Sequence, residues 1–125
     1  MYNPERFKYG VDFQDRMEES IFLDVVGDSP RMRILQYLIE GRDFDYTLTD
    51  MINAGVSWGT LHSEFPKLLK LGIVIKVREI GRAKLYKINK ENPVAKRLID
   101  LFDSLILQEL EKWKTKTKKR ILVTA

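Results

Sequence analysis

The stretch that decides the fold runs from Asp45 to Asn89 and reads DYTLTDMINAGVSWGTLHSEFPKLLKLGIVIKVREIGRAKLYKIN. Thr47 is followed three residues later by Asp50, a spacing that resembles a capping box and predicts the start of a short helix. Gly55 is the natural end of that helix, since glycine readily adopts the left-handed backbone of a helix stop. Ser57 then stands where a second helix would be capped, which predicts two helices joined by a tight turn.

The second helix is expected over residues 57–71, and Gly72 is expected to stop it. Its apolar residues recur every three or four positions, which is typical of a helix with one buried face: Leu61, Phe65, Leu68 and Leu71. Two alternating strands within residues 73–88 follow, around a turn at Gly81, with Ile73, Ile75 and Val77 expected to face inward and Lys76 and Arg78 outward. A helix, turn, helix and hairpin in this order predict a winged helix-turn-helix.

The flanking segments predict further helices. Ser29 and Pro30 begin a helix that Gly41 ends, and a short strand is expected over Phe44–Thr47. Asn92 and Pro93 begin a long final helix. The expected organisation is an N-terminal arm and short helix (1–27), the winged helix-turn-helix (28–90), a C-terminal dimerisation helix (91–114) and a basic tail (115–125). The fold class is mainly α with a small β-wing.

Composition excludes several classes of function. The 125 residues fit one domain, and 44% of them are hydrophobic, as in ordinary globular proteins. With no cysteine and a single histidine, the chain offers no thiolate or multi-histidine metal site, and no cofactor is expected. No apolar run approaches the ~20 residues of a membrane span, and the first residues lack the apolar core of a signal peptide. We therefore expect a soluble, cytoplasmic protein.

Charge is strongly segregated along the chain. Residues 1–56 carry a net charge of −5 and residues 57–90 one of +6, whereas residues 91–111 carry −3 and residues 112–125 carry +6. The first basic block coincides with the second helix and the hairpin. This coincidence favours a basic face that contacts nucleic acid phosphates.

The chain resembles a known family in three segments: GDSPRMRILQYLIEG, TLTDMINAGVSWGTLHSEFPKLLKLGIV and GRAKLYKIN. Together they are similar to archaeal winged-helix DNA-binding regulators related to the ArsR and MarR groups. The best-matching signature is S-x-x-T-L-x-x-x-F-x-x-L-x-x-L-G-I-V, from Ser57 to Val74. The resemblance covers roughly residues 20–110 and implies the fold more than the target. Pro66 departs from an ordinary recognition helix and predicts a kink there.

A recognition helix presents its outward N-terminal residues to the major groove, and a wing contacts the flanking backbone or the minor groove. Residues 57–71 leave few outward groups able to read bases through paired hydrogen bonds, so affinity is expected to depend on the wing, with Arg82 as the minor-groove candidate. Trp58 either packs in the core or contacts DNA, and His62 either reads a base or is an ordinary solvent-facing residue. The candidate DNA-binding set is Ser57, Trp58, Thr60, His62, Ser63, Lys67, Arg78, Arg82 and Lys84.

The final helix is apolar on more than one face, so part of it needs a second surface. Either a second copy of the chain covers it, or the N-terminal segment does so within one chain. The candidate dimerisation residues are Leu98, Leu101, Phe102, Leu105, Ile106, Leu110 and Trp113.

The sequence therefore predicts a dimeric transcription regulator that binds double-stranded DNA with some sequence preference and catalyses no reaction. Two alternatives stay open: an architectural or segregation-type DNA-binding protein of low specificity, and a protein-interaction winged-helix module. The sequence identifies no effector.

Overall fold

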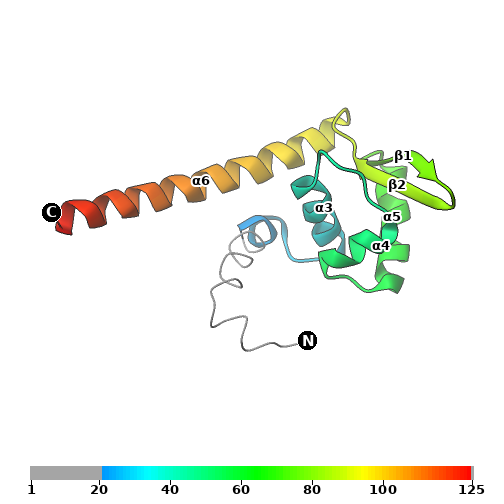
Figure 1. The fold of residues 1–125 in the computed structure, drawn as a ribbon, viewed down its shortest axis with the longest axis horizontal. Coiled ribbons are helices and arrows are strands. Elements are labelled where there is room, and N and C mark those ends of the chain that lie inside the picture. Colours follow the sequence, from blue (N-terminus) through cyan, green and yellow to red (C-terminus); the bar gives the residue numbers. More distant parts are fainter. Residues whose placement is uncertain (1–20, 125) are drawn as a thin grey trace.

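The computed structural model describes residues 21–124, with side chains described from residue 21 to residue 115. The N-terminal arm expected before the first helix lies outside the described residues. Residues 21–26 are helical, and Figure 1 shows the next elements gathered at one end while the last helix extends away from them as an arm. In chain order these elements are α3 (Pro30–Glu40), α4 (Leu48–Met51), a 3-10 turn (Ile52–Ala54), α5 (Trp58–Lys70), β1 (Val74–Ile80), β2 (Ala83–Ile88) and α6 (Pro93–Thr124).

Helix α3 is the centre of the folded end. The Ser29 side chain accepts a hydrogen bond from the Met32 amide, and Pro30 occupies the first turn, so the predicted start is confirmed. One face of α3 enters the core with residues from every neighbouring element. The core comprises Phe22, Leu23, Ile34, Leu35, Leu38, Ile39, Met51, Val56, Leu61, Phe65, Leu68, Ile73, Val74, Tyr86, Ile88, Ala95 and Phe102.

The helix-turn-helix follows its local signals closely. The Thr47 side chain accepts from the Asp50 amide at 3.1 Å, and the Asp50 carboxylate accepts from the Thr47 amide at 2.9 Å, which confirms the capping box. Gly55 ends the 3-10 turn with a φ of 86°, a conformation that strains side chains other than glycine. The chain then extends through Ser57, which caps α5.

Helix α5 buries Leu61, Phe65 and Leu68 as expected. Leu71 was expected to join them, but it is 57% exposed because it is the C-terminal cap residue, where the helix is already ending. Ile73 lies in the core after the turn at Gly72. The helix continues through Pro66 to Lys70, and the kink expected there stays a prediction.

The wing is an antiparallel hairpin of β1 and β2 in which Val74 pairs with Ile88. Its inward residue at the start of β1 is Val74, so the expected inward positions of Ile75 and Val77 are wrong; these side chains are 38% and 44% exposed. A bulge between Lys76 and Arg78 further shifts the alternation of the strand. Sequence alternation could not reveal either the register or the bulge.

The strand expected over Phe44–Thr47 is reduced to a single bridge. Tyr46 exchanges two backbone hydrogen bonds with Tyr86 of β2, at 2.7 and 2.8 Å. Pairing stops there because Thr47 already caps α4. The bridge nevertheless fixes the wing against the first half of the fold.

Helix α6 begins where predicted, since the Asn92 side chain accepts hydrogen bonds from the Val94 and Ala95 amides. Phe102 packs edge-on against Phe22 with ring centroids 5.5 Å apart, which fixes the first half of α6 to the core. The helix does not end near residue 114 as expected but continues to Thr124, because no glycine or proline interrupts it after Pro93. No helix within residues 21–124 has the length and apolar character needed to cross a membrane.

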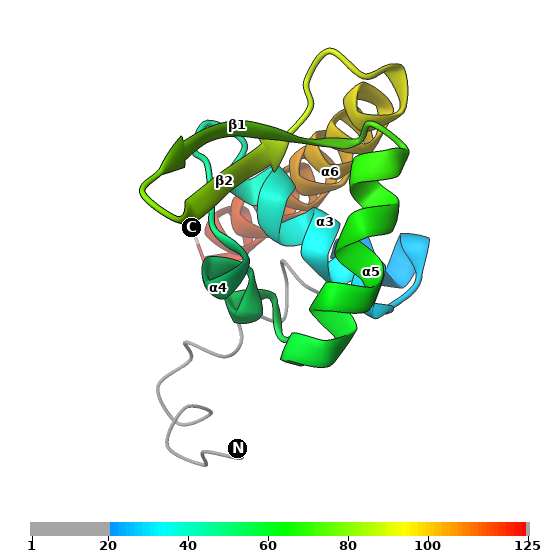
Figure 2. The same cartoon turned by 90° about the vertical axis from the view of Figure 1, so that its right-hand side faces the viewer.

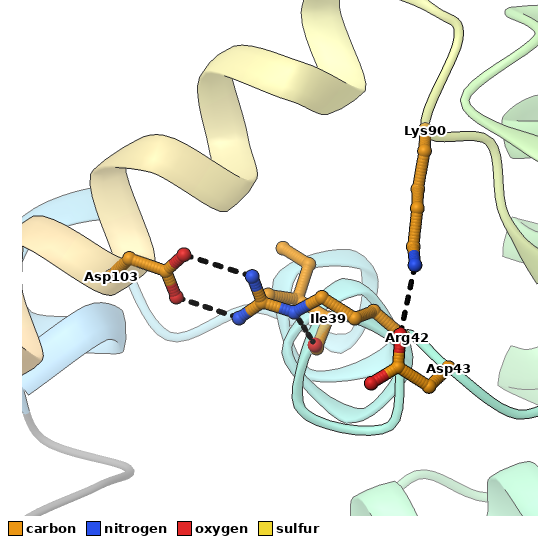
Figure 3. A network of polar contacts seen from close by, with 5 residues as sticks. All are labelled: Ile39, Arg42, Asp43, Lys90 and Asp103. Atoms are coloured by element: carbon orange, nitrogen blue, oxygen red, sulfur yellow. Dashed lines mark hydrogen bonds and ion pairs between the residues drawn. The ribbon is translucent and has the colours of Figure 1, made fainter.

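A polar cluster joins α6 to the end of α3 (Figure 3). The Arg42 guanidinium donates two hydrogen bonds to Asp103 of α6, at 2.8 and 2.6 Å, and a third to the Ile39 carbonyl at 2.9 Å. Beside it, the Lys90 ammonium donates to the Asp43 carboxylate at 2.9 Å. These contacts connect the segment after α3 to the loop before α6, through Lys90, and to α6 itself, through Asp103.

The Arg42–Asp103 pair predicts a pH-dependent contribution to stability. The Arg42 guanidinium holds the pKa of the Asp103 carboxyl below its usual range of about 4. Because the folded-state pKa is lowered, the stabilisation is complete above the ordinary pKa and is lost as pH falls through the lowered one. Asp103→Asn should reduce the free energy of unfolding by about 0.5–1 kcal/mol at neutral pH, since the pair is partly exposed.

Urea unfolding of both proteins from neutral to strongly acidic pH checks this prediction. The difference in unfolding free energy between wild type and Asp103→Asn should shrink towards zero in acid. The matched control is Asp100→Asn, the same change at an exposed position of α6. An equal loss from both variants, or a loss that does not depend on pH, would contradict the assigned pair.

Candidate nucleic-acid interface

Helix α5 and the wing lie on the same side of the molecule. Figure 2, viewed towards that side, shows α5 on one side of α3, the hairpin and α4 on the other, and α6 running away behind them. Helix α5 and the wing, together with the start of α4, make up the candidate interface.

Two hydroxyl groups stand at the start of α5. The Ser57 hydroxyl accepts from the Thr60 amide at 3.2 Å and donates to the Thr60 hydroxyl oxygen at 2.8 Å. Ser57 is exposed and Thr60 is half-buried. Ser57 therefore has a structural role as a cap, and the Thr60 hydroxyl hydrogen stays available to a phosphate oxygen.

Trp58, His62 and Ser63 lie on the outward side of α5. The Trp58 side chain is 46% exposed and is absent from the core, so core packing does not explain it. Its ring meets the His62 ring at 87° with centroids 4.4 Å apart. The two aromatic residues, one helical turn apart, thus form a single exposed patch, with Ser63 exposed beside it.

Further along α5, Glu64 binds two basic residues. Its carboxylate accepts a hydrogen bond from the Arg31 guanidinium of α3 at 2.8 Å and lies 3.6 Å from the Lys67 ammonium. The Arg31 hydrogen bond lowers the pKa of the Glu64 carboxyl. Lys67 is thus exposed but already near an anion, which reduces the charge it offers to DNA.

Arg78 of the wing also has a partner. Its guanidinium donates two hydrogen bonds to Asp45, at 2.7 and 3.2 Å, and these hold the pKa of the Asp45 carboxyl below its usual range. The pair joins β1 to the segment before α4, beside the Tyr46–Tyr86 bridge. Arg78 therefore positions the wing, and it would have to leave Asp45 to contact a phosphate directly.

Arg82 and Lys84 stand at and beside the tip of the hairpin. Both are exposed, and neither forms an ion pair within the part of the chain that the structure describes. An open pocket of about 290 Å³ lies between them and the start of α4. It is lined by Thr47, Leu48, Thr49, Arg82, Ala83, Lys84 and Tyr86.

This pocket brings together groups that the sequence alone did not connect. Thr47 and Thr49 were not among the predicted site residues, because their proximity to the wing depends on tertiary structure. The capping box gave the position of α4 in the chain but not its position beside the hairpin. Two cationic side chains and two hydroxyl groups around an open pocket are suited to binding the anionic phosphate backbone of a nucleic acid.

The predicted dimerisation residues divide into two groups along α6. Phe102 is buried in the core of its own chain, and Leu98, Leu101, Leu105 and Ile106 are half-buried against that core. Leu110 and Trp113 are 50% and 43% exposed. Leu107, outside the predicted set, is 61% exposed and lies between the two groups.

The described residues include no group of three histidine, cysteine, aspartate or glutamate side chains that could hold a metal ion. The face offers groups suited to non-covalent binding. It combines exposed cations, hydroxyl groups and an aromatic patch.

No protein-family model matches the sequence, and no curated protein matches it. Two solved structures are similar in fold. One is MepR, a transcription regulator of the Staphylococcus aureus multidrug efflux pump MepA, with a TM-score of 0.51, 13% identity and coverage of 99% of this chain and 100% of that one. The other is the Mycobacterium tuberculosis MarR family protein Rv2887, in complex with p-aminosalicylic acid, with a TM-score of 0.50, 19% identity and coverage of 97% and 96%. The chain thus has a MarR-like winged-helix fold with a long C-terminal helix.

Proposed function

We propose that this protein is a dimeric transcription regulator that binds double-stranded DNA. Helix α5 enters the major groove, and the wing contacts the adjacent backbone and minor groove. The observation that carries the proposal is the placement of α5 and the hairpin at the same end of the molecule (Figure 2), with exposed residues at the start of α5 and the exposed cations Arg82 and Lys84 at and beside the hairpin turn. The fold shared with the regulator MepR supports the same function.

The wing supplies most of the electrostatic attraction in this arrangement. Of the predicted basic contacts, Lys67 and Arg78 form ion pairs with carboxylates, whereas Arg82 forms none among the described residues and Lys84 lies opposite Glu79 in the hairpin without an ion pair. A narrow A·T-rich minor groove has an enhanced negative potential that attracts arginine. Arg82, at the hairpin tip after Gly81, is the side chain placed to enter such a groove.

Dimerisation is the second part of the proposal. The core packs against α6 as far as Ile106, and beyond it Leu107, Leu110 and Trp113 recur every third residue along the exposed arm. Apolar residues at this spacing lie on one side of a helix and favour burial against a second apolar surface. A second copy of the chain supplies that surface and places two α5 helices about one turn of DNA apart.

A low-specificity architectural DNA-binding protein is the second candidate. It is favoured by the outward face of α5, whose exposed residues include no arginine, asparagine or glutamine able to form paired hydrogen bonds with a base. Footprinting separates the two candidates. Discrete protected sites support a regulator, whereas continuous protection along any duplex supports an architectural protein.

Arg82→Ala tests the wing. Since each neutralised phosphate contributes about 0.9 to the slope of log K against log salt, the variant should reduce that slope by roughly one unit and weaken binding to every sequence. The loss should be larger for A·T-rich duplexes. Fluorescence anisotropy over a range of salt concentrations measures both effects.

Arg97→Ala is the matched control for this measurement, because it removes the same exposed side chain from α6, outside the candidate interface. It should leave affinity and slope close to wild type. An equal effect of the two variants would assign the result to net charge alone. Wild-type affinity that does not depend on salt would contradict the proposed binding mode.

Leu110→Glu tests the dimer. A carboxylate placed in an apolar interface loses its hydration, so the variant should dissociate to a species of 14.7 kDa while keeping its fold. Gln108→Glu adds the same charge at an exposed neighbouring position and should stay dimeric. Sedimentation velocity measures the mass, and circular dichroism the fold. A monomeric wild type, or a Leu110→Glu variant with unchanged mass, would contradict dimerisation through α6.

A further inference from the structure

The outward surface of α5 is poor in groups that read bases by hydrogen bonding. Its exposed side chains in the first two turns are Trp58, His62 and Ser63, with Gly59 between them and Pro66 following. Direct readout in the major groove relies mainly on arginine, lysine, asparagine and glutamine. The largest exposed group at the start of this helix is instead an indole.

The structure holds that indole in a defined place. Trp58 is the first residue of α5, and its ring packs at 87° against that of His62, four residues later. An edge-to-face aromatic contact of this kind restricts the rotation of both side chains. Trp58 is therefore a positioned apolar group on the surface, with 46% of it still exposed.

The backbone beside Trp58 leaves room for a close approach. A Cβ atom added at Gly59 would meet nothing within 4 Å, and its φ is not positive, so neither packing nor conformation requires glycine there. Glycine inside a helix is destabilising relative to alanine. A bare backbone next to an exposed indole fits a surface that another molecule approaches closely.

We propose that Trp58, positioned by His62, recognises the C5-methyl group of thymine in the major groove. This inference rests on the proposed DNA binding and adds the base feature that is read. The C5-methyl group of thymine is the apolar feature of base edges in the major groove, and the N-terminal residues of a recognition helix reach those edges. Contact removes the methyl group and part of the indole from water.

The experiment compares two duplexes of the same A·T-rich sequence, one with thymine and one with uracil at every such position. Uracil lacks only the methyl group. Wild type should bind the uracil duplex about fourfold more weakly for each methyl contacted, which is the effect of losing one buried carbon. Trp58→Ala should bind the thymine duplex more weakly and lose this discrimination, so that its two affinities become nearly equal.

Two further variants separate recognition from structure. Leu71→Ala removes another exposed apolar side chain, at the C-terminal cap of α5 far from the first turn. It should keep the wild-type ratio of the affinity for the thymine duplex to that for the uracil duplex. His62→Ala removes the ring that positions the indole and should reduce the ratio only in part. Thermal unfolding of each variant, followed by circular dichroism, identifies any that fail to fold. If Trp58→Ala is among them, Trp58→Ser replaces it, with the same expected loss of discrimination.

The outcomes separate this inference from the proposed function. If wild type binds neither duplex, the proposed DNA binding itself fails. If wild type binds both duplexes equally, or if Trp58→Ala keeps the full thymine preference, DNA binding stands and methyl recognition by Trp58 is overturned. A preference that is present in wild type and Leu71→Ala and absent from Trp58→Ala supports the inference.

Discussion

The short segment that follows α3 connects that helix to the wing and to the C-terminal arm through ion pairs. Arg42 binds Asp103 of α6 with two hydrogen bonds and satisfies the Ile39 carbonyl at the end of α3 with a third (Figure 3). Asp43 binds Lys90, and Asp45 binds Arg78 of β1. Three residues of the segment 42–45 therefore connect α3 to the arm, to the loop before it and to the wing. None of these ion pairs is deeply buried, so their main effect is to fix geometry and not to add large stability.

This arrangement divides the basic residues of the chain into two groups. Arg31, Arg42 and Arg78 are held by carboxylates from other elements, and these pairs orient helices and strands. Within the described part of the chain, Arg82 and Lys84 form no ion pair with another element, and they stand at the open end of the hairpin. The positive charge of residues 57–90 is thus less uniform than its sum suggests. Some of these basic residues hold the elements of the candidate interface in place through ion pairs, and the others are available to a ligand.

The fold was largely predictable because its signals are local. The caps at Ser29, Thr47 and Ser57 and the stops at Gly55 and Gly72 each act within a few residues, and the structure contains all of them. The errors have two sources. The inward positions in β1 were wrong because register and bulge depend on pairing with β2, and the strand around Tyr46 is a single bridge because α4 begins immediately after it.

The same distinction applies to the candidate site. The pattern of α5 left Trp58 open between core packing and DNA contact, and it could not reveal the ring contact that positions this exposed residue. The partner of Arg78 lies 33 residues away, and no spacing rule connects the two. The pocket between α4 and the wing could not be predicted from the sequence either, because its lining residues come from segments that are brought together only in the folded chain.

Affinity and specificity therefore have separate sources on this surface. The wing offers charge without base-specific hydrogen bonds, and such contacts position a protein on DNA without reading its sequence. In the proposed complex, the aromatic patch at the start of α5 distinguishes bases by methyl content and contributes modestly at each site. Modest recognition becomes useful when two copies act together, because linked sites bind far more tightly than either one alone. The exposed apolar arm of α6 is the part of the chain that can link them, so the proposed readout and the proposed dimer depend on each other.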